Sequence, residues 1–272
     1  MTTYAFPPGG MPPLNDDPAA GAIFTPAYAL IPGSTMRDIT ASLLPGWDRT
    51  RAWIIARPLT GFAETFAQYA VEVAPGGGSA TPESDTGAEA GILVASGTMT
   101  LTLDGETHLL GAGGYAYIPP GRDWRVANDD TTALKFHWIR KRHVRAPGLG
   151  LPDPIIGSDA SSPLNFMPGT DKWATQRFAD PTDLRHDMHV NIVTFQPGGR
   201  IPFAETHVME HGLYVLEGTA DYLLNDRWHS VGPGDFMWLR AFCPQACIAT
   251  GDGPFRYLLY KDVNRHPLLV LS

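Results

Sequence analysis

Four potential metal ligands occur close together in the second half of the sequence. Glu205 and His207 are two residues apart, His211 follows shortly afterwards, and Gln245 comes two predicted strands later. Because side chains two residues apart on a β-strand point to the same face, Glu205 and His207 can bind the same metal ion. The set offers two imidazoles, one carboxylate and one amide oxygen, without sulfur. Such a mixture suits Mn²⁺, Fe²⁺, Co²⁺ or Ni²⁺, and Zn²⁺ is also compatible.

The spacing also indicates how the chain must fold around these residues. His211 cannot lie beside Glu205 on one straight strand, because six residues span roughly 20 Å. We therefore expect a turn near Val208–Glu210 that returns His211 on the next strand. Gln245 is expected to close the ring from the opposite wall of a barrel. Glu210, in the same stretch, is expected to point away from that face into solvent.

A single histidine in a β-protein is most often a surface or hydrogen-bonded residue. Two histidines and a carboxylate within seven residues favour a metal site instead. The other histidines lack such a pattern, and we interpret them as structural or surface residues: His108, His137, His143, His186, His189, His229 and His266.

The elements that must position these ligands occur as two copies of one pattern. Residues 71–78 (VEVAPGGG) resemble residues 193–200 (VTFQPGGR). Glycines in one register predict an internal duplication. The matched pairs, each 121 residues apart, are Gly78 with Gly199, Gly97 with Gly218, and Gly113 with Gly234.

Each copy has the pattern of β-strands rather than helices. Runs rich in β-branched and aromatic residues, such as 189–195 (HVNIVTF), are bounded by Gly, Pro, Asn and Asp. Segments 133–144 and 255–265 are predicted to close each copy with a strand. The predicted fold is all-β, with two tandem barrels. Its expected divisions are a loop-rich N-terminal extension (1–50) lying across a barrel or contacting a partner subunit, a first barrel (51–145), a Pro/Gly/Ser-rich linker (146–175) and a second barrel (176–272).

Composition limits the functional classes further. The formal net charge of −8 argues against nucleic acid as a partner. No stretch approaches the ~18 apolar residues of a membrane helix, and the start lacks a signal-peptide pattern, so we expect a cytoplasmic protein. Cys243 and Cys247, four residues apart on a strand, would be roughly 13 Å from each other, too far to form a disulfide. Free thiols in a reducing compartment are predicted.

The spacing of the second copy resembles that of the cupin family. Its members show the motifs G-x5-H-x-H-x3,4-E-x6-G and G-x5-P-x-G-x2-H-x3-N. The chain has Gly199-x5-Glu205-x-His207-x3-His211-x6-Gly218 and Gly234-x5-Arg240-x-Phe242-x2-Gln245. The resemblance over residues 60–265 implies a bicupin, two tandem jelly-roll-like barrels. The first copy holds Ser84, Thr86, Ala90 and Trp124 at the ligand positions, so we expect this barrel to have kept the fold and lost the metal.

A closer resemblance is to the (S)-ureidoglycine aminohydrolase family. Residues 205–212 (ETHVMEHG), 255–265 (FRYLLYKDVNR) and 187–199 (DMHVNIVTFQPGG) are similar to segments of that family. The resemblance implies a Mn²⁺-dependent hydrolase that releases ammonia from (S)-ureidoglycine in allantoin breakdown, and bicupins tend to form homo-oligomers. It places the metal ligands at Glu205, His207, His211 and Gln245, and the substrate contacts at Glu205, Gln245, Tyr257 and Lys261.

Individual roles follow from residue chemistry. Tyr257 and Lys261 are four residues apart on the closing strand, so both can face the barrel interior. Lys261 offers an ammonium to a substrate carboxylate, and Tyr257 a hydroxyl donor. Glu205 is hypothesised to alternate between metal ligand and proton acceptor. Without the family match, Lys261 would be read as a solvated lysine and Tyr257 as a core aromatic.

Two other functions fit the same residues. A metal-dependent dioxygenase acting on a small organic acid is one, because Glu205, His207 and His211 could form a two-His-one-carboxylate set. Fold similarity alone does not exclude it. A non-enzymatic cupin that binds a small molecule is the other. Oxygen uptake would identify the first, and absence of metal from the purified protein would favour the second.

Overall fold

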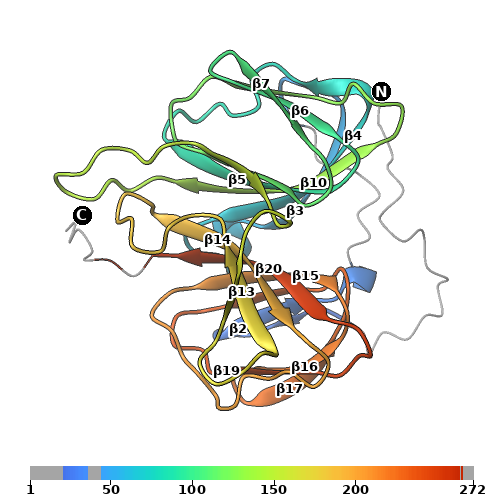
Figure 1. Ribbon diagram of the computed structural model, residues 1–272, viewed down its shortest axis with the longest axis vertical. Coiled ribbons are helices and arrows are strands. Elements are labelled where there is room, and N and C mark those ends of the chain that lie inside the picture. Colours follow the sequence, from blue (N-terminus) through green and yellow to red (C-terminus); the bar gives the residue numbers. More distant parts are fainter. Residues whose placement is uncertain (1–20, 36–43, 264, 266–272) are drawn as a thin grey trace.

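Two β-barrels, one per sequence copy, stack on each other in the computed structural model, which describes residues 21–35, 44–263 and 265 (Figure 1). The strands of the first barrel are β3 (Trp47–Ala56), β4 (Ala67–Ser79), β5 (Ala88–Ser96), β6 (Met99–Leu103), β7 (Glu106–Leu110), β8 (Gly114–Ile118), β9 (Trp124–Ala127) and β10 (Leu134–Arg142). Those of the second are β13 (Trp173–Arg177), β14 (Met188–Phe195), β15 (His211–Glu217), β16 (Ala220–Leu224), β17 (Arg227–Val231), β18 (Phe236–Leu239), β19 (Gln245–Ala249) and β20 (Phe255–Asp262). The predicted all-β bicupin architecture is confirmed, and β10 and β20 close the two copies as expected.

Segments outside the two copies add short strands to the barrels. The sheet order β11-β8-β5-β10-β4-β9-β6-β7, with β3 paired to β4, forms the first barrel. The orders β1-β2-β18-β15-β20-β14-β13-β12 and β17-β16-β19 form the second. The remaining elements are β1 (Ile23–Phe24), β2 (Tyr28–Ile31), β11 (Ile155–Ser158), β12 (Leu164–Phe166) and the 3₁₀ turns η2 (Gly33–Thr35) and η3 (Pro58–Thr60).

The segment that precedes the first barrel therefore joins the second. β2 pairs with β18, so part of the expected N-terminal extension completes the far barrel. The segment between the copies adds one strand to each barrel, because β11 pairs with β8 of the first barrel and β12 pairs with β13 of the second. Residues 1–20 and 36–43 of the extension, and His266, lie outside the described residues.

Backbone hydrogen bonds correct one part of the predicted duplication. Gly113 donates to Val94 as Gly234 does to Val215, each at 2.9 Å, so the separation of 121 holds there. The match of Gly78 with Gly199 is wrong. Asn128 donates to the carbonyl of Gly77 (3.0 Å) just as Ala249 donates to that of Gly199 (2.9 Å), which makes Gly77 the equivalent residue. The two copies thus differ in length by one residue between Gly77 and the start of β5.

Three hydrophobic clusters stabilise this arrangement, one inside each barrel and one between them. Two glycines let the barrels approach closely. A Cβ on Gly91 would lie 3.0 Å from Val190, and one on Gly212 would lie 2.5 Å from the ring of Phe66. Since Gly91 and Gly212 occupy equivalent positions on β5 and β15, each barrel presents the same strand to the other.

The interior of the first barrel is filled by aromatic side chains. Trp124 is only 6% exposed, and its ring lies 5.9 Å from that of Trp138. Ala90 is buried beside them in the same cluster. Trp124 thus occupies the interior space that the second barrel leaves around Gln245, as predicted.

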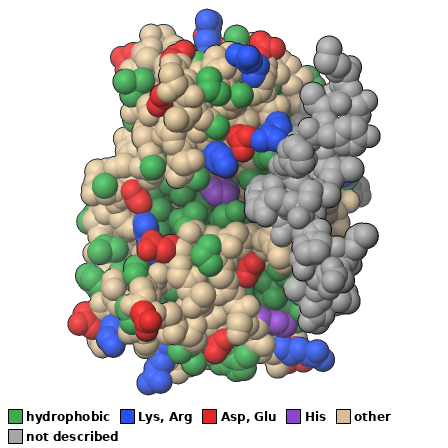
Figure 2. Space-filling model, turned by 90° about the vertical axis from the view of Figure 1, so that its right-hand side faces the viewer, with side chains coloured by type: hydrophobic (Ala, Val, Ile, Leu, Met, Phe, Trp, Pro, Cys, Tyr) green, Lys and Arg blue, Asp and Glu red, His purple; other side chains and the backbone are tan. Residues whose placement is uncertain are grey.

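Three features of the structure bear on the predictions made from composition: the surface charges, the cysteines and the length of the helices. On the face shown in Figure 2, acidic and basic side chains are interspersed rather than gathered into one basic patch. Cys243 and Cys247 are both free, as predicted. Within the described residues, no helix has the length and apolar character needed to cross a bilayer.

A buried histidine between the barrels makes stability depend on pH. His137 contacts Tyr214 of the other barrel (ring centroids 4.2 Å), and burial lowers its pKa from 6.5 to about 4. The pKa of His137 is lower in the folded protein than in the unfolded chain. The contribution of the neutral, buried His137 to stability is therefore intact above pH 6.5 and is lost as pH falls toward 4. We expect the loss to reach about 3 kcal/mol.

The His137→Phe variant measures this contribution. Urea unfolding at neutral pH and at about pH 4.5 should show a smaller acid-induced loss in the variant than in the wild-type protein. Equal losses in the two proteins would mean that His137 does not titrate on unfolding.

Candidate metal and substrate site

A cavity of about 190 Å³ opens at one end of the second barrel. It is lined by strands β13, β14, β15, β19 and β20 and by the segment between β14 and β15. Every residue singled out for metal or substrate binding lines this cavity: Glu205, His207, His211, Gln245, Tyr257 and Lys261. The sequence thus located one shared site, while the role of each residue stays a prediction.

Strand register places Lys261 next to His211. The two residues are directly paired across β20 and β15, and Lys261 is also paired with His189 on β14. Cross-strand partners project from the same face of a sheet. Tyr257, four residues before Lys261, therefore faces the same interior, where it is paired with Val193.

The remaining side chains come from the other side of the barrel. Glu205 and Gln245 are cross-strand partners that exchange two backbone hydrogen bonds of 2.9 Å. Gln245 begins β19, in the sheet that lies apart from His211, so it reaches the cavity from the opposite wall as expected. The chain bends at residues 208–209 and starts β15 at His211, which confirms the predicted turn.

Two polar-atom distances around Glu205 are close to those of neighbouring ligands of one ion. Glu205 Oε1 lies 3.3 Å from His207 Nε2 and 3.4 Å from Gln245 Nε2, and the His207 and His211 rings are 5.0 Å apart. Ligands at about 2.1 Å from an ion are about 3 Å from one another in octahedral geometry. Burial lowers the pKa of His211 to about 3, which leaves its imidazole neutral and able to coordinate. The donor set fits a divalent transition metal.

The orientation of Gln245 bears on that fit. Tyr222 donates a hydrogen bond of 2.8 Å to Gln245 Oε1, while Nε2 faces Glu205. Coordination through the amide oxygen requires the amide to turn, and the Tyr222 hydroxyl can then accept from Nε2. Tyr222 is therefore the residue that orients the Gln245 amide.

Burial also shifts the pKa values of Lys261 and Tyr257, the two candidates for substrate contact. Burial lowers the pKa of Lys261, and the positive charge of Arg177 lowers that pKa further. Burial raises the pKa of Tyr257 well above the usual value, so the phenol stays protonated. Within the described part of the chain, the Lys261 side chain has no ion-pair partner. An ammonium without a carboxylate partner is suited to bind a ligand anion.

The prediction that Glu210 is solvated is wrong. Its side chain is buried and accepts hydrogen bonds from the backbone of Glu64 (2.9 Å) and Thr65 (2.6 Å) and from Trp238 Nε1 (2.8 Å). The hydroxyl of Thr65 also donates to it. Glu210 does point away from the cavity, but toward the segment that enters β4 rather than toward water.

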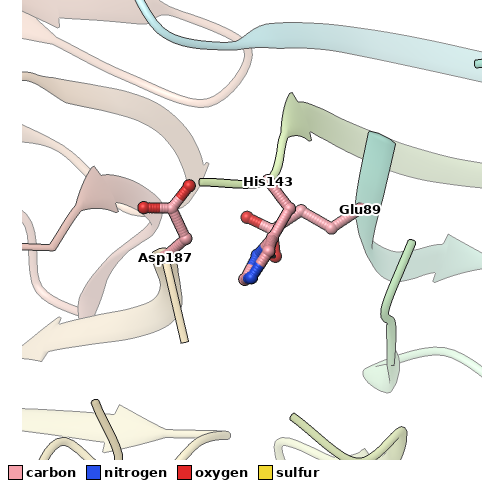
Figure 3. Close-up of side chains that lie close together, drawn as sticks. All are labelled: Glu89, His143 and Asp187. Carbon is pink, nitrogen blue, oxygen red and sulfur yellow. Dashed lines mark hydrogen bonds and ion pairs between the residues drawn. The ribbon is translucent and has the colours of Figure 1, made fainter. Parts of the chain in front are cut away.

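A second group of ligand-type residues lies between the barrels (Figure 3). Glu89, His143 and Asp187 have atoms within 4.8 Å of one another and could hold a metal ion. Several of their atoms are already paired, although Glu89 Oε1 and His143 Nε2 have no hydrogen-bond partner among the described residues. His143 Nδ1 is 2.8 Å from Glu89, and Asp187 forms ion pairs with Lys141 and Arg265. Two positively charged side chains beside Asp187 would repel a metal ion, which is a third positive charge. We therefore interpret the group as a set of ion pairs that joins the barrels.

Sequence reasoning missed several residues of the cavity. Asn191 is a polar residue inside the otherwise largely apolar run 189–195, a signal that could have found it. Thr175 is the last residue of the predicted linker and Arg177 comes shortly after it, so no sequence motif marked either as a site residue. Tyr222 reads as an ordinary strand aromatic, because its hydrogen bond to Gln245 depends on pairing between β16 and β19.

Comparison with known proteins defines the class of the chain. The family model for the cupin domain matches residues 69–140 and 191–260, one segment in each barrel. The protein is thus a bicupin. It is 37% identical over 249 residues to a protein of Oryza sativa subsp. japonica named probable (S)-ureidoglycine aminohydrolase, covering 91% of this chain and 77% of that one. The (S)-ureidoglycine aminohydrolase of Escherichia coli K12 is 31% identical over 232 residues, covering 85% and 87%.

The chain therefore belongs to the (S)-ureidoglycine aminohydrolase family. A solved structure agrees closely with the fold. The crystal structure of a glyoxylate-induced protein from Pseudomonas aeruginosa has a TM-score of 0.91 and 57% identity, with all of both chains covered.

Proposed function

We propose that this protein hydrolyses (S)-ureidoglycine to (S)-ureidoglycolate and ammonia, a step of allantoin and purine breakdown. The observation that carries the proposal is the meeting of six candidate residues in one cavity of a chain from this family. In the reaction the bond between the α-carbon and the amine nitrogen breaks, and a bond to the oxygen of water forms. The cavity of about 190 Å³ suits a substrate of this small size.

The same proposal assigns Mn²⁺ to Glu205, His207, His211 and Gln245. When bound, the metal would supply Lewis-acid polarisation and a fixed orientation of the substrate. Nitrogen and oxygen ligands without sulfur are consistent with manganese, although they also fit iron, cobalt and nickel.

The other roles follow from charge and position. Lys261 would hold the substrate carboxylate, and the protonated phenol of Tyr257 would donate a hydrogen bond to it. Glu205 would accept the proton that the attacking water loses and return a proton to the leaving amine. Glu205 can do this because it lies at the cavity wall beside His207 and Gln245.

Ammonia release from freshly prepared (S)-ureidoglycine tests the proposal. Mn²⁺-loaded protein should accelerate release above the spontaneous rate and give one enantiomer of ureidoglycolate. Glu205→Ala should lower kcat by at least about 10²-fold, as expected for loss of a general acid–base group. Glu217→Ala is the matched control, because Glu217 is a half-exposed carboxylate at the end of β15. No acceleration by wild-type protein that contains metal would refute the proposed reaction.

A dioxygenase is the second candidate, because Glu205, His207 and His211 provide two histidines and one carboxylate in the same cavity. Oxygen consumption with a small organic acid, using iron-loaded protein, would favour it over the hydrolase. A protein purified without any metal would favour simple binding of a small molecule. Assembly as a homo-oligomer and a cytoplasmic location complete the proposal.

A further inference from the structure

Arg177 is a second, solvent-exposed positive charge that lines the cavity. It is the last residue of β13 and lines the same hollow as Lys261. Within the described residues, its side chain makes neither an ion pair nor a hydrogen bond. Arg256, by contrast, pairs with Asp159 and Glu217. Two cations that line one small cavity, neither paired with a carboxylate among the described residues, are suited to bind an anionic ligand group.

Asn191 lies between these two cations on the interior face. It is directly paired with Arg177 across β13 and β14, and with Leu259 across β14 and β20. Leu259 is two residues from Lys261, so all three polar side chains project from one continuous face.

The amide of Asn191 is itself short of partners. The residue is only 3% exposed and lines the cavity, yet its side chain forms no hydrogen bond with any described residue. Its amide is open to the cavity, so a ligand there can provide the partner that the protein does not.

We propose that Arg177 and Asn191 form a substrate-recognition wall, in which Arg177 shares the substrate carboxylate with Lys261 and Asn191 hydrogen-bonds the ureido group. The inference rests on the proposed function and deepens it. The planar guanidinium matches a carboxylate in a two-point contact. The amide of Asn191 offers donors and an acceptor, which complement the C=O and NH₂ of a ureido group.

Binding of two inert analogues tests this wall directly. N-carbamoylglycine has the carboxylate and ureido group but no leaving amine, and N-carbamoylglycinamide replaces its carboxylate with a neutral amide. Calorimetry with Mn²⁺-loaded wild-type protein should show tighter binding of the acid. Arg177→Met should weaken the acid at least about tenfold and leave the neutral amide unchanged, and Arg177→Lys should recover part of the affinity. Asn191→Leu should weaken both analogues.

Turnover gives a second readout with a matched control. Arg177→Met should raise KM for (S)-ureidoglycine about tenfold with a smaller effect on kcat, since the contact holds a non-reacting group. Arg227→Met, at an exposed arginine of β17, should change neither constant. Metal content should be the same in all of these proteins.

The outcomes separate this inference from the proposed reaction. Unchanged acid binding and unchanged KM in Arg177→Met, with an active wild-type enzyme, would overturn the recognition wall and leave the reaction standing. Wild-type protein that distinguishes acid from amide through Arg177, but releases no ammonia, would refute the reaction and support the wall. Equal weakening of both analogues by Arg177→Met would overturn its assignment to the carboxylate.

Discussion

His211→Ala is expected to lose its bound metal and to lower the rate of ammonia release by at least about 10³-fold. A bound metal supplies several kcal/mol of transition-state stabilisation, and about 4 kcal/mol corresponds to this factor. His211 is the ligand candidate most firmly fixed by the fold, because it begins β15 and is paired with both Leu239 and Lys261. An alanine there leaves a gap that neighbouring strands cannot fill with another ligand.

Metal analysis after loading with Mn²⁺ and gel filtration, together with the ammonia assay, measures this effect. His229→Ala is the control, since His229 belongs to the same barrel but contacts Tyr28 outside the cavity. It should retain metal and activity. A His211→Ala protein with a full complement of metal and a near-normal rate would show that the centre lies elsewhere, and the group of Glu89, His143 and Asp187 would then be the first place to look.

The site could be predicted because its residues obey short-range rules. Strand periodicity put Glu205 and His207 on one face, and the length of a strand required a turn before His211. Duplication predicted the barrel strands, since the strands of one copy match those of the other. These constraints act within a few residues or within a repeated pattern, so a single sequence contains them. Gln245 was placed by its cupin-like spacing, and Tyr257 and Lys261 by the family resemblance.

The errors came from contacts between segments far apart in the chain. Glu210 looked solvated because its partners, Glu64 and Thr65, lie between β3 and β4 of the first barrel and give no local signal. The one-residue difference between copies was hidden by the run Gly76–Gly78, in which a shift of one still aligns glycine with glycine. Only the hydrogen bonds identify Gly77 as the equivalent of Gly199.

Glu210→Ala is expected to lower the free energy of unfolding by about 3–5 kcal/mol. The substitution removes the acceptor of four donors, namely the backbone N–H groups of Glu64 and Thr65, the Thr65 hydroxyl and the buried indole of Trp238. Each unsatisfied buried donor costs about 1–3 kcal/mol. Glu210→Gln should be milder, because one amide oxygen still accepts while the NH₂ group faces other donors.

Urea unfolding followed by tryptophan fluorescence measures the loss, with Glu217→Ala, at the far end of β15, as the exposed carboxylate control. Activity should fall together with stability. The Glu210 carboxylate joins the turn before His211 to the segment that enters β4, so its loss loosens that turn, whereas the backbone hydrogen bond of residue 210 to Asp262 (2.7 Å) is kept. A loss below about 1 kcal/mol would mean that water satisfies the freed donors. The position of His211 would then depend on strand pairing alone, and activity should survive the substitution.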